Sequence, residues 1–219
     1  MPEMETRVWL VRHAETAAPH LFHGAESDVG LSERGKLQAI AAAGWFRPLA
    51  PTAVVSSAMR RAADTAAPIA AMCGVPHTLE PALHERFVGA LSGTTFSVSD
   101  GPWSETLRRW QAGETSYAMP GAETFDAIRA RVLPAWEPVV TAHRGGRVVL
   151  VAHGVVCKVL LFSLLPGLTV ADWTAVGKVL NLAVSTLVQP PGGAWRAESL
   201  LVVPDPVRAL AGGPAGSAA

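Results

Sequence analysis

The sequence has no excess of charge of either sign. Its 18 lysine and arginine residues balance 18 aspartate and glutamate residues, so the formal net charge is zero. A protein without net charge has no overall field that would attract nucleic acid or a membrane surface. We therefore expect neither of these partners, and any site for an anion must be built locally.

The sequence is also poor in cysteine and in long apolar runs. Its two cysteines, Cys73 and Cys157, lack the spacing of metal ligands, and a secreted fold held by disulfides would carry more of them. The best candidate for a membrane span, residues 155–165, contains Lys158 and is too short to cross a bilayer. Residues 1–7 are polar and have no signal-peptide core. We expect a cytoplasmic protein with free thiols.

The chain does contain enough apolar material for one core, with 219 residues of which 49% are hydrophobic. We predict a single domain over residues 1–210 and a disordered tail over residues 211–219, which are glycine, alanine, serine and proline. Strand-like segments alternate with helix-like ones, which predicts a three-layer α/β/α fold around a mostly parallel sheet. Two strand-like runs, 181–188 and 195–202, flank Pro190-Pro191-Gly192-Gly193 and predict a C-terminal antiparallel hairpin.

Hydrophobic periodicity predicts the remaining elements. Strands are expected at residues 8–11, 52–56, 75–79 and 147–152. Helices are expected between Ser32 and Pro48 and at residues 57–67, 103–111, 120–140 and 155–165. Ser32 is the natural N-cap of the first helix, and Leu37, Ile40 and Trp45 are expected to form its apolar stripe.

Basic side chains and imidazoles follow three of the predicted strands. Arg12 and His13 come directly after the first strand, and His153 comes after the strand that ends at residue 152. Arg61 lies in the first turn of the helix after the second strand. A cation there is unfavourable because it opposes the helix dipole, so its presence indicates a role outside the helix. Because the carboxyl ends of parallel strands meet at one edge of a sheet, these side chains should form one cationic pocket.

Two arginines and two imidazoles suit a phosphoryl group, because arginine binds its oxygens in pairs and imidazole is a competent nucleophile toward phosphorus. Attack by a neutral ring nitrogen gives a phosphohistidine and divides one hard displacement into two easier steps. The leaving alkoxide then needs a proton, and the loop residue Glu85 is a candidate acid. Arg60 is expected to face solvent, since one helical step turns it away from Arg61.

These residues belong to an ordered set of motifs that resembles the phosphatase branch of the histidine phosphatase superfamily, which has the phosphoglycerate-mutase-like fold. The family signature is Arg-His-Gly after the first strand and a second His-Gly after a later strand, and here Ala14 replaces the first glycine. We expect this alanine to be tolerated, although it loses the freedom of glycine at positive φ. The motifs, in the family's order, are Arg12-His13-Ala14-Glu15-Thr16, Leu31-Ser32-Glu33-Arg34-Gly35 with Gln38-Ala39, Ser56-Ser57 to Arg61-Ala62, Asp64-Thr65-Ala66, Leu83-His84-Glu85, Gly89, Gly93, Pro120-Gly121-Ala122-Glu123, Val151-Ala152-His153-Gly154 and Asn181.

The resemblance implies a division of roles. His13 would be the phosphorylated nucleophile, and Arg12, Arg61 and His153 would bind the phosphate. Glu85 would act first as the general acid and then as the base that activates water. The resemblance implies no metal ion and no other cofactor, and a metal centre built from the histidines is not expected, because arginine beside a cation is unfavourable.

Four positions around this centre are expected to border the substrate. Thr16 closes the first motif, and Ser57 could either bind phosphate or cap the following helix. Glu123 would support the site, either by ordering the phosphate arginines or by capping a helix start. The family often has an asparagine and an arginine in the loop after the first motif. This loop has neither, so His20 or His23 is expected to replace part of its polar wall.

The expected activity is metal-independent hydrolysis of a small phosphorylated substrate, and two alternatives stay open. A cofactor-dependent phosphoglycerate mutase uses the same pocket but keeps the phosphoryl group from water. The short stretch between Glu85 and Glu123, together with the first loop, argues against a mutase. A phosphate-ester-binding protein without turnover would have lost an essential residue, and the nucleophile, the acid and the phosphate ligands are all present. Both a monomer and a homodimer fit the sequence.

Overall fold

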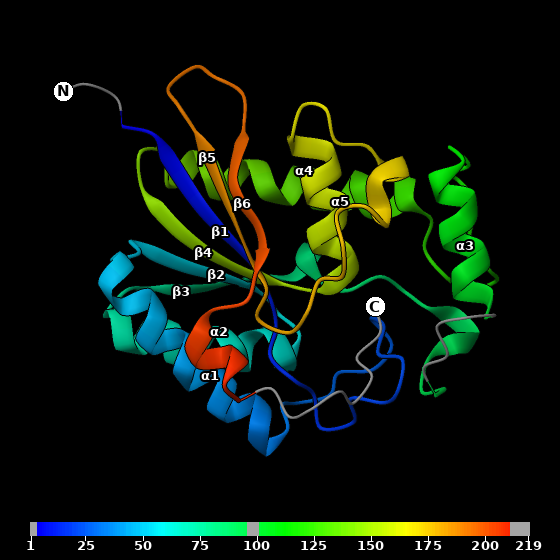
Figure 1. Cartoon of the computed structure of the whole chain (residues 1–219), viewed down its shortest axis with the longest axis horizontal. Coiled ribbons are helices and arrows are strands. Elements are labelled where there is room, and N and C mark those ends of the chain that lie inside the picture. Colours follow the sequence, from blue (N-terminus) through cyan, green and yellow to red (C-terminus); the bar gives the residue numbers. More distant parts are fainter. Residues whose placement is uncertain (1–3, 96–100, 211–219) are drawn as a thin grey trace.

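A computed structural model describes residues 4–95 and 101–210, in which helices cover both faces of a six-stranded sheet (Figure 1). The strands are β1 Thr6–Arg12, β2 Ala53–Ser57, β3 His77–Glu80, β4 Arg147–Ala152, β5 Val184–Gln189 and β6 Arg196–Val202. The helices are α1 Glu33–Phe46, α2 Arg60–Cys73, α3 Pro102–Gln111, α4 Phe125–Ala142, α5 Gly154–Leu164 and α6 Asp205–Arg208. Short 3₁₀ turns are η1 Arg47–Leu49, η2 Pro81–Leu83, η3 Gly89–Leu91 and η4 Val170–Trp173. None of these helices is long and apolar enough to cross a membrane.

The strand order in the sheet is β3-β2-β4-β1-β5-β6. The pairs β3-β2, β2-β4 and β4-β1 are parallel, whereas β5 is antiparallel to both β1 and β6. The predicted α/β/α fold with a mostly parallel sheet and a C-terminal hairpin is therefore confirmed. The predicted tail, residues 211–219, lies outside the described residues. Because β4 lies between β2 and β1, the carboxyl ends of these three strands meet at one edge.

β1 shows how the sheet divides the core into two layers. Successive side chains of a strand point to opposite faces. Val8 and Leu10 pack with α4 and α5 on one face, whereas Trp9 and Val11 pack with α1 and α2 on the other. All four side chains are buried. A strand covered on both faces needs apolar side chains at every position, which explains the continuous apolar run in the sequence.

The packing of α1 differs from the prediction. Ser32 caps the helix as expected, because its Oγ accepts a hydrogen bond from Gly35 N at 2.9 Å. The predicted apolar stripe is wrong, since Leu37 and Ile40 are 55% and 53% exposed. The buried positions are Gly35, Gln38, Ala39, Ala42, Ala43 and Phe46. Small side chains allow close packing, and at Gly35 a Cβ atom would lie only 2.1 Å from Glu15 O.

Two helices begin later than predicted. The helix after β2 begins at Arg60 instead of residue 57, and α4 begins at Phe125 instead of residue 120. Thr124 is the N-cap of α4, because its hydroxyl accepts a hydrogen bond from Ala127 N at 3.0 Å. Glu123 therefore precedes the helix and its side chain is available for other contacts.

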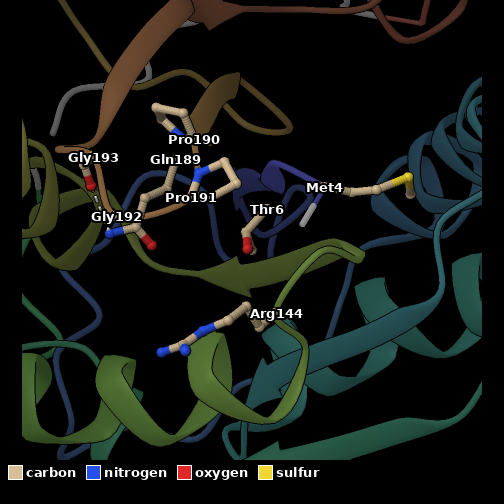
Figure 2. A pocket seen from close by; sticks show the side chains of 8 residues that line it. All are labelled: Met4, Thr6, Arg144, Gln189, Pro190, Pro191, Gly192 and Gly193. Atoms are coloured by element: carbon tan, nitrogen blue, oxygen red, sulfur yellow. Dashed lines mark hydrogen bonds between the residues drawn. The ribbon is translucent and has the colours of Figure 1, made fainter. Parts of the chain in front are cut away.

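The opposite edge of the sheet, where β1 begins and β5 ends, has a hollow of about 270 Å³. Its walls come from the start of β1, the turn before β4 and the connection between β5 and β6 (Figure 2). The lining residues are Met4, Thr6, Arg144, Gln189, Pro190, Pro191, Gly192 and Gly193. Arg144 is the only charged residue among them. Thr6 Oγ1 accepts a hydrogen bond from Gly145 N at 3.0 Å, and the lining has no imidazole or carboxylate that could activate this hydroxyl toward an ester.

Candidate active site

β1, β2 and β4 bring the predicted arginines and imidazoles to one edge of the sheet. Arg12 of β1 is paired with the last residue of β4, so His13 and His153 directly follow the ends of adjacent strands. The centroids of their rings are 5.2 Å apart, at an interplanar angle of 60°. Arg61, from the first turn of α2, donates a hydrogen bond to His153. We call Arg12, His13, Arg61 and His153 the strand-end cluster.

The imidazole of His13 is buried and uncharged. Its Nδ1 lies 2.7 Å from Ala14 O, and because a carbonyl oxygen only accepts, Nδ1 carries the proton and Nε2 keeps its lone pair. Burial, followed by the charges of Arg61 and Arg12, lowers the pKa of His13 well below 6.5. At neutral pH the ring therefore has one uncharged nitrogen that is free to react.

The backbone around His13 is held by three hydrogen bonds. His13 N donates to Ala152 O at 2.9 Å, and the side-chain amide of Asn181 donates to His13 O at 3.0 Å. Ala14 N donates to Thr65 Oγ1 at 3.0 Å. Ala14 is not among the described residues with positive φ, so alanine fits here without strain, as expected. The roles of Asn181 and Thr65 were not predicted, although both lie in the ordered set of motifs.

His153 is part of a buried chain of hydrogen bonds. Nε of Arg61 donates to Nδ1 of His153 at 3.2 Å, so the imidazole proton is on Nε2, which lies 2.9 Å from Ser57 Oγ. Burial, followed by the charge of Arg61, lowers the pKa of His153 well below 6.5. Ser57 Oγ also accepts from Met59 N, the N-cap residue of α2, at 3.3 Å. Ser57 thus supports both the imidazole and the start of α2.

Arg61 links the strand-end cluster to the loop after the first motif. Its Nη1 donates to Ser27 O at 2.8 Å and its Nη2 donates to Gly24 O at 3.2 Å. Burial lowers the pKa of Arg61 to about 10, so the guanidinium stays charged at neutral pH. Arg60 is exposed, as predicted, and its backbone amide donates to Asp28 Oδ1 at 2.7 Å. The contacts of Arg61 explain why a cation lies in the first turn of α2.

Arg12 has hydrogen-bond donors that the protein does not use. Its Nη1 donates to Val179 O at 2.6 Å, but its Nε is buried without a partner in the described part of the chain. A buried donor left unpaired costs roughly 1–3 kcal/mol. Burial lowers the pKa of Arg12, and the charge of Glu85 opposes this shift. An anion bound at this edge would supply the missing acceptor.

Glu85 reaches the same place from the loop after η2. Its side chain is 9% exposed, and its carboxylate accepts hydrogen bonds from Arg86 N at 2.9 Å and Val155 N at 3.3 Å. Val155 lies in the first turn of α5, where the positive end of the helix favours a carboxylate. The charge of Glu85 also favours the charged forms of Arg12 and Arg61. The carboxylate therefore lies beside the two arginines, where a general acid is needed.

An ion pair between Glu123 and Arg131 holds the segment that carries Glu85. Nε and Nη2 of Arg131 donate to the carboxylate of Glu123, both at 2.9 Å. Arg131 also donates to Ala82 O at 2.8 Å and to Glu85 O at 3.3 Å, while Glu123 accepts from Phe87 N at 2.9 Å. In the described residues, Glu123 makes no hydrogen bond to either arginine of the strand-end cluster. Its support reaches the site through the Glu85 segment instead.

Two loops, residues 17–30 and residues 86–95, lie side by side next to the strand-end cluster, and we call them the rim. Ala25 N donates to Arg86 O at 3.0 Å. The backbone amides of residues 88 and 89 both donate to Glu26 Oε1 at 2.8 Å. These bonds join the loop after the first motif, which the sequence indicated as a wall of the pocket, to the segment after Glu85.

Thr16 and His23, both expected to border the substrate, are held within the protein. Thr16 is buried at the start of the first loop. Nδ1 of His23 lies 3.0 Å from Ser27 Oγ, and its Nε2 lies 2.8 Å from Ala18 O. Both ring nitrogens of His23 therefore hold the loop in its shape, whereas His20 is exposed.

The donor set of the site suits an anion. Over residues 4–95 and 101–210, no three histidine, cysteine, aspartate or glutamate side chains gather as metal ligands would. The strand-end cluster instead places two guanidinium groups beside two imidazoles, and these charges would repel a cation.

Comparison with known proteins agrees with this geometry. The family model of the histidine phosphatase superfamily (branch 1) matches residues 8–201. The chain is 35% identical over 188 residues to the metal-independent phosphoserine phosphatase of Arabidopsis thaliana, which covers 83% of this chain and 76% of that protein. It is 33% identical over 199 residues to the glucosyl-3-phosphoglycerate phosphatase of Mycobacterium tuberculosis, which covers 86% of each protein.

A solved structure is similar over nearly the whole fold. It is the complex of mycobacterial glucosyl-3-phosphoglycerate phosphatase with inorganic phosphate, which has a TM-score of 0.75 and 29% sequence identity to this chain. The alignment covers 90% of this chain and 97% of that chain. The residues matched by the family model, 8–201, include the strands and helices that carry the strand-end cluster.

Proposed function

The chain belongs to the histidine phosphatase superfamily, and we propose that it hydrolyses small phosphomonoesters without a metal ion, through a phosphohistidine on His13. The observation that carries this proposal is the uncharged imidazole of His13, whose Nε2 is free, beside His153 and two guanidinium groups. A neutral nitrogen is needed for attack on phosphorus, and fixed positive charge is needed to hold the oxygens of the phosphoryl group.

In the first step, the lone pair on Nε2 of His13 attacks phosphorus, and the bond between phosphorus and the ester oxygen breaks. The electron pair of that bond goes to the leaving oxygen, which takes a proton from the carboxyl group of Glu85. Arg12 and Arg61 stabilise the charge on the transferring phosphoryl group, and the Nε2–H of His153, which faces Ser57 Oγ without substrate, would turn to the same oxygens. The hydrogen bond on Nδ1 of His13 keeps the ring in the tautomer that can attack.

In the second step, water attacks the phosphohistidine. The carboxylate of Glu85 takes a proton from the water, whose oxygen bonds to phosphorus as the bond to Nε2 of His13 breaks. The electron pair returns to the nitrogen, inorganic phosphate leaves, and Glu85 is again protonated. One carboxyl group can serve both steps, because the leaving oxygen and the attacking water occupy the same side of phosphorus.

The substrate in this proposal is a small phosphorylated molecule, because two similar proteins are named for phosphoserine and for glucosyl-3-phosphoglycerate. A reducing compartment such as the cytoplasm is part of the same proposal, since both cysteines are free thiols. The homodimer stays a prediction.

Phosphate release from a panel of phosphomonoesters, by protein treated with a chelator, tests the proposal. We expect the wild type to release phosphate and to form an acid-labile, base-stable phosphoprotein. His13→Ala should lose the phosphoprotein, and its rate should fall at least roughly 1,000-fold. His143→Ala, at the other end of the fold after α4, is the matched control and should keep both properties.

Three outcomes would contradict the proposal. Labile phosphate that persists in His13→Ala would place the nucleophile elsewhere. A wild type that releases no phosphate from any ester would exclude the hydrolysis. Transfer between the positions of phosphoglycerate that is faster than phosphate release would instead favour a mutase.

A further inference from the structure

A row of exposed residues runs along the outer side of α1, a helix at the outside of the molecule (Figure 1). The row consists of Glu33, Leu37, Ile40, Gly44 and Arg47, and each of them is exposed. Arg47 is the C-cap residue of α1 and keeps helical dihedral angles, so the row continues to it. α1 contacts α2 and α6, but neither helix covers this row, which we call the α1 seam.

The spacing of the α1 seam is typical of a contact between two helices. Its successive members are four, three, four and three residues apart. This is the narrow stripe by which helices pair in a coiled coil, whereas a helix packed on a globular core buries a wider face. A different face of α1, which includes Ala39 and Ala43, packs on the core of the chain. The seam is therefore a second, separate contact surface.

The middle of the α1 seam combines two large apolar side chains with a gap. Leu37 and Ile40 are each more than half exposed, and they lie one helical turn apart. At Gly44 an added Cβ atom would meet no atom within 4 Å, so nothing in the chain itself requires glycine there. Glycine is unfavourable inside a helix, but it lets a side chain from another helix approach the backbone closely. Neighbouring exposed apolar residues beside such a gap indicate a partner helix.

The charges at the two ends of the seam decide which partner fits. Glu33 begins the seam and Arg47 ends it, and Arg47 makes no ion pair with any described residue. The seam is therefore complementary to its own reverse. In an antiparallel pair of such helices, Glu33 of each chain faces Arg47 of the other, whereas a parallel pair would place like charges together.

We propose that the α1 seam binds the α1 seam of a second copy of this chain, with the two helices antiparallel and a two-fold axis at Ile40. In this arrangement Leu37 of each chain packs over Gly44 of the other, and the two Ile40 side chains meet on the axis. The same residues contribute from both chains, as a closed two-fold dimer requires.

This dimer should be weak and should leave both candidate active sites open. One pair of helices buries less than the roughly 800 Å² per partner of a standard interface, so we expect a Kd of about 1–100 μM. α1 begins beside the first motif, because Ser32 N donates to Glu15 O at 3.0 Å. Since the paired helices run in opposite directions, the two sites lie at opposite ends of the dimer, and hydrolysis does not depend on it.

Sedimentation equilibrium over a range of concentrations tests the proposal. The mass of the wild type should rise from that of one chain, 22.9 kDa, toward twice that value. Ile40→Glu places two like charges on the axis and should raise the Kd at least about 100-fold. Leu79→Glu is the matched control, because Leu79 is 55% exposed but lies on β3, and it should leave the Kd unchanged.

Gly44→Gln separates the interface from the fold. It fills the gap in the seam and should raise the Kd at least about 10-fold. The Tm of the dilute protein, measured by circular dichroism, should stay the same or rise, since glutamine favours a helix more than glycine does.

Exchange of the end charges tests the antiparallel arrangement. Glu33→Arg and Arg47→Glu should each raise the Kd about 5- to 20-fold, because each places like charges together at both ends. The double variant should return to within about three-fold of the wild type. The two residues are about 21 Å apart along one helix, so this recovery can arise only from a contact between chains.

A wild type that keeps the mass of one chain throughout would overturn the proposal. A dimer that survives both Ile40→Glu and Gly44→Gln, or that is lost in Leu79→Glu, would overturn it by placing the contact elsewhere. A double variant as weak as the single ones would overturn the antiparallel pairing. The kcat/KM per chain of Ile40→Glu should stay within about two-fold of the wild type, so failure of the dimer and failure of the proposed hydrolysis are separate results.

Discussion

The strand-end cluster and the rim border the same pocket but are built in different ways. The cluster stands on the ends of β1 and β4 and in the first turn of α2, and Arg61 and His153 are completely buried. The rim consists of two loops that are joined by backbone hydrogen bonds and by the carboxylate of Glu26. In the proposed mechanism the cluster faces the phosphoryl group, which all phosphomonoesters share, whereas the rim faces the part of the substrate that differs between them. In this proposal the ends of regular elements hold the nucleophile and the phosphate ligands, whereas loops hold the general acid Glu85 and the groups that set selectivity.

Replacing each of two adjacent arginines tests this comparison. One of the two substitutions should give the largest loss of activity among the tests of this comparison. Arg61 is buried in the cluster and Arg60 is exposed. Arg61→Gln removes a fixed charge from the phosphoryl site, and kcat/KM should fall by about 100- to 1,000-fold on every ester. Arg60→Gln makes the same chemical change one residue away and should stay within about two-fold of the wild type. Steady-state kinetics on one ester with a carboxylate and one without checks both values.

Arg61→Lys separates charge from geometry in the same experiment. Lysine keeps a positive charge but cannot donate at once to His153, Ser27 O and Gly24 O as Arg61 does. An intermediate loss is expected. If Arg61→Gln were impaired on only one class of ester, Arg61 would contribute to selectivity, and the division between cluster and rim would be wrong.

The strand-end cluster could be predicted because few assumptions are needed to place it. The apolar run before Arg12 and His13 predicts a buried strand, and parallel strands bring their carboxyl ends to one edge. The partners of these groups could not be predicted in the same way. The hydrogen bonds from Arg131 to Glu123 and to Glu85 O depend on how α4 lies against a loop, and no spacing in the sequence specifies that arrangement.

Two failures of prediction have a common physical cause. Periodicity identifies large apolar residues such as Leu37 and Ile40, but close packing of α1 favours small residues, and these large ones face solvent. The burial of Arg86 was missed because this residue lies in an irregular loop, where no periodicity distinguishes a buried side chain from an exposed one. In both cases the amino-acid type suggested the wrong environment, and tertiary packing decided it.

The ion pair between Glu123 and Arg131 connects the rim, at Phe87 N, to the backbone of Glu85. Breaking it should have an effect of intermediate size on the rate of hydrolysis. Glu123→Gln weakens the hold on the segment that carries Glu85. We expect kcat/KM for alkyl phosphates to fall about 10-fold, because the step that forms the phosphohistidine needs a proton from Glu85 on their leaving oxygen. For p-nitrophenyl phosphate, whose leaving group needs no proton, kcat/KM should fall less than about three-fold, since kcat/KM does not include the later attack of water.

Glu105→Gln is the matched control for this substitution. Glu105 is likewise paired with arginine, in its case Arg108 and Arg109, but on the surface of α3. It should leave both rates unchanged. An equal loss on the alkyl and the nitrophenyl ester in Glu123→Gln would mean that the ion pair supports the fold in general and does not position the acid.

The smallest predicted effect is on the pH dependence of stability. It is measured by replacing one histidine from each region. Burial, followed by the charges of Arg61 and Arg12, keeps the pKa of His13 well below 6.5 in the folded protein, whereas an unfolded histidine titrates near about 6.5. Below about pH 6.5 the unfolded chain therefore binds a proton that the folded chain does not, and stability falls as the pH falls. One such histidine contributes at most about 1.4 kcal/mol per pH unit, and its contribution is fully present above that pH.

His13→Gln should therefore flatten the pH dependence of the free energy of unfolding between about pH 6.5 and 5, and His23→Gln should flatten it less. Burial also lowers the pKa of His23, but that residue is only half-buried and its hydrogen bond with Ala18 O opposes the shift. Urea unfolding at several pH values measures both slopes. Equal flattening by the two substitutions would show that folding lowers the pKa of His23 in the rim as much as that of His13 in the cluster. The two regions would then not differ in their electrostatic effect on a histidine.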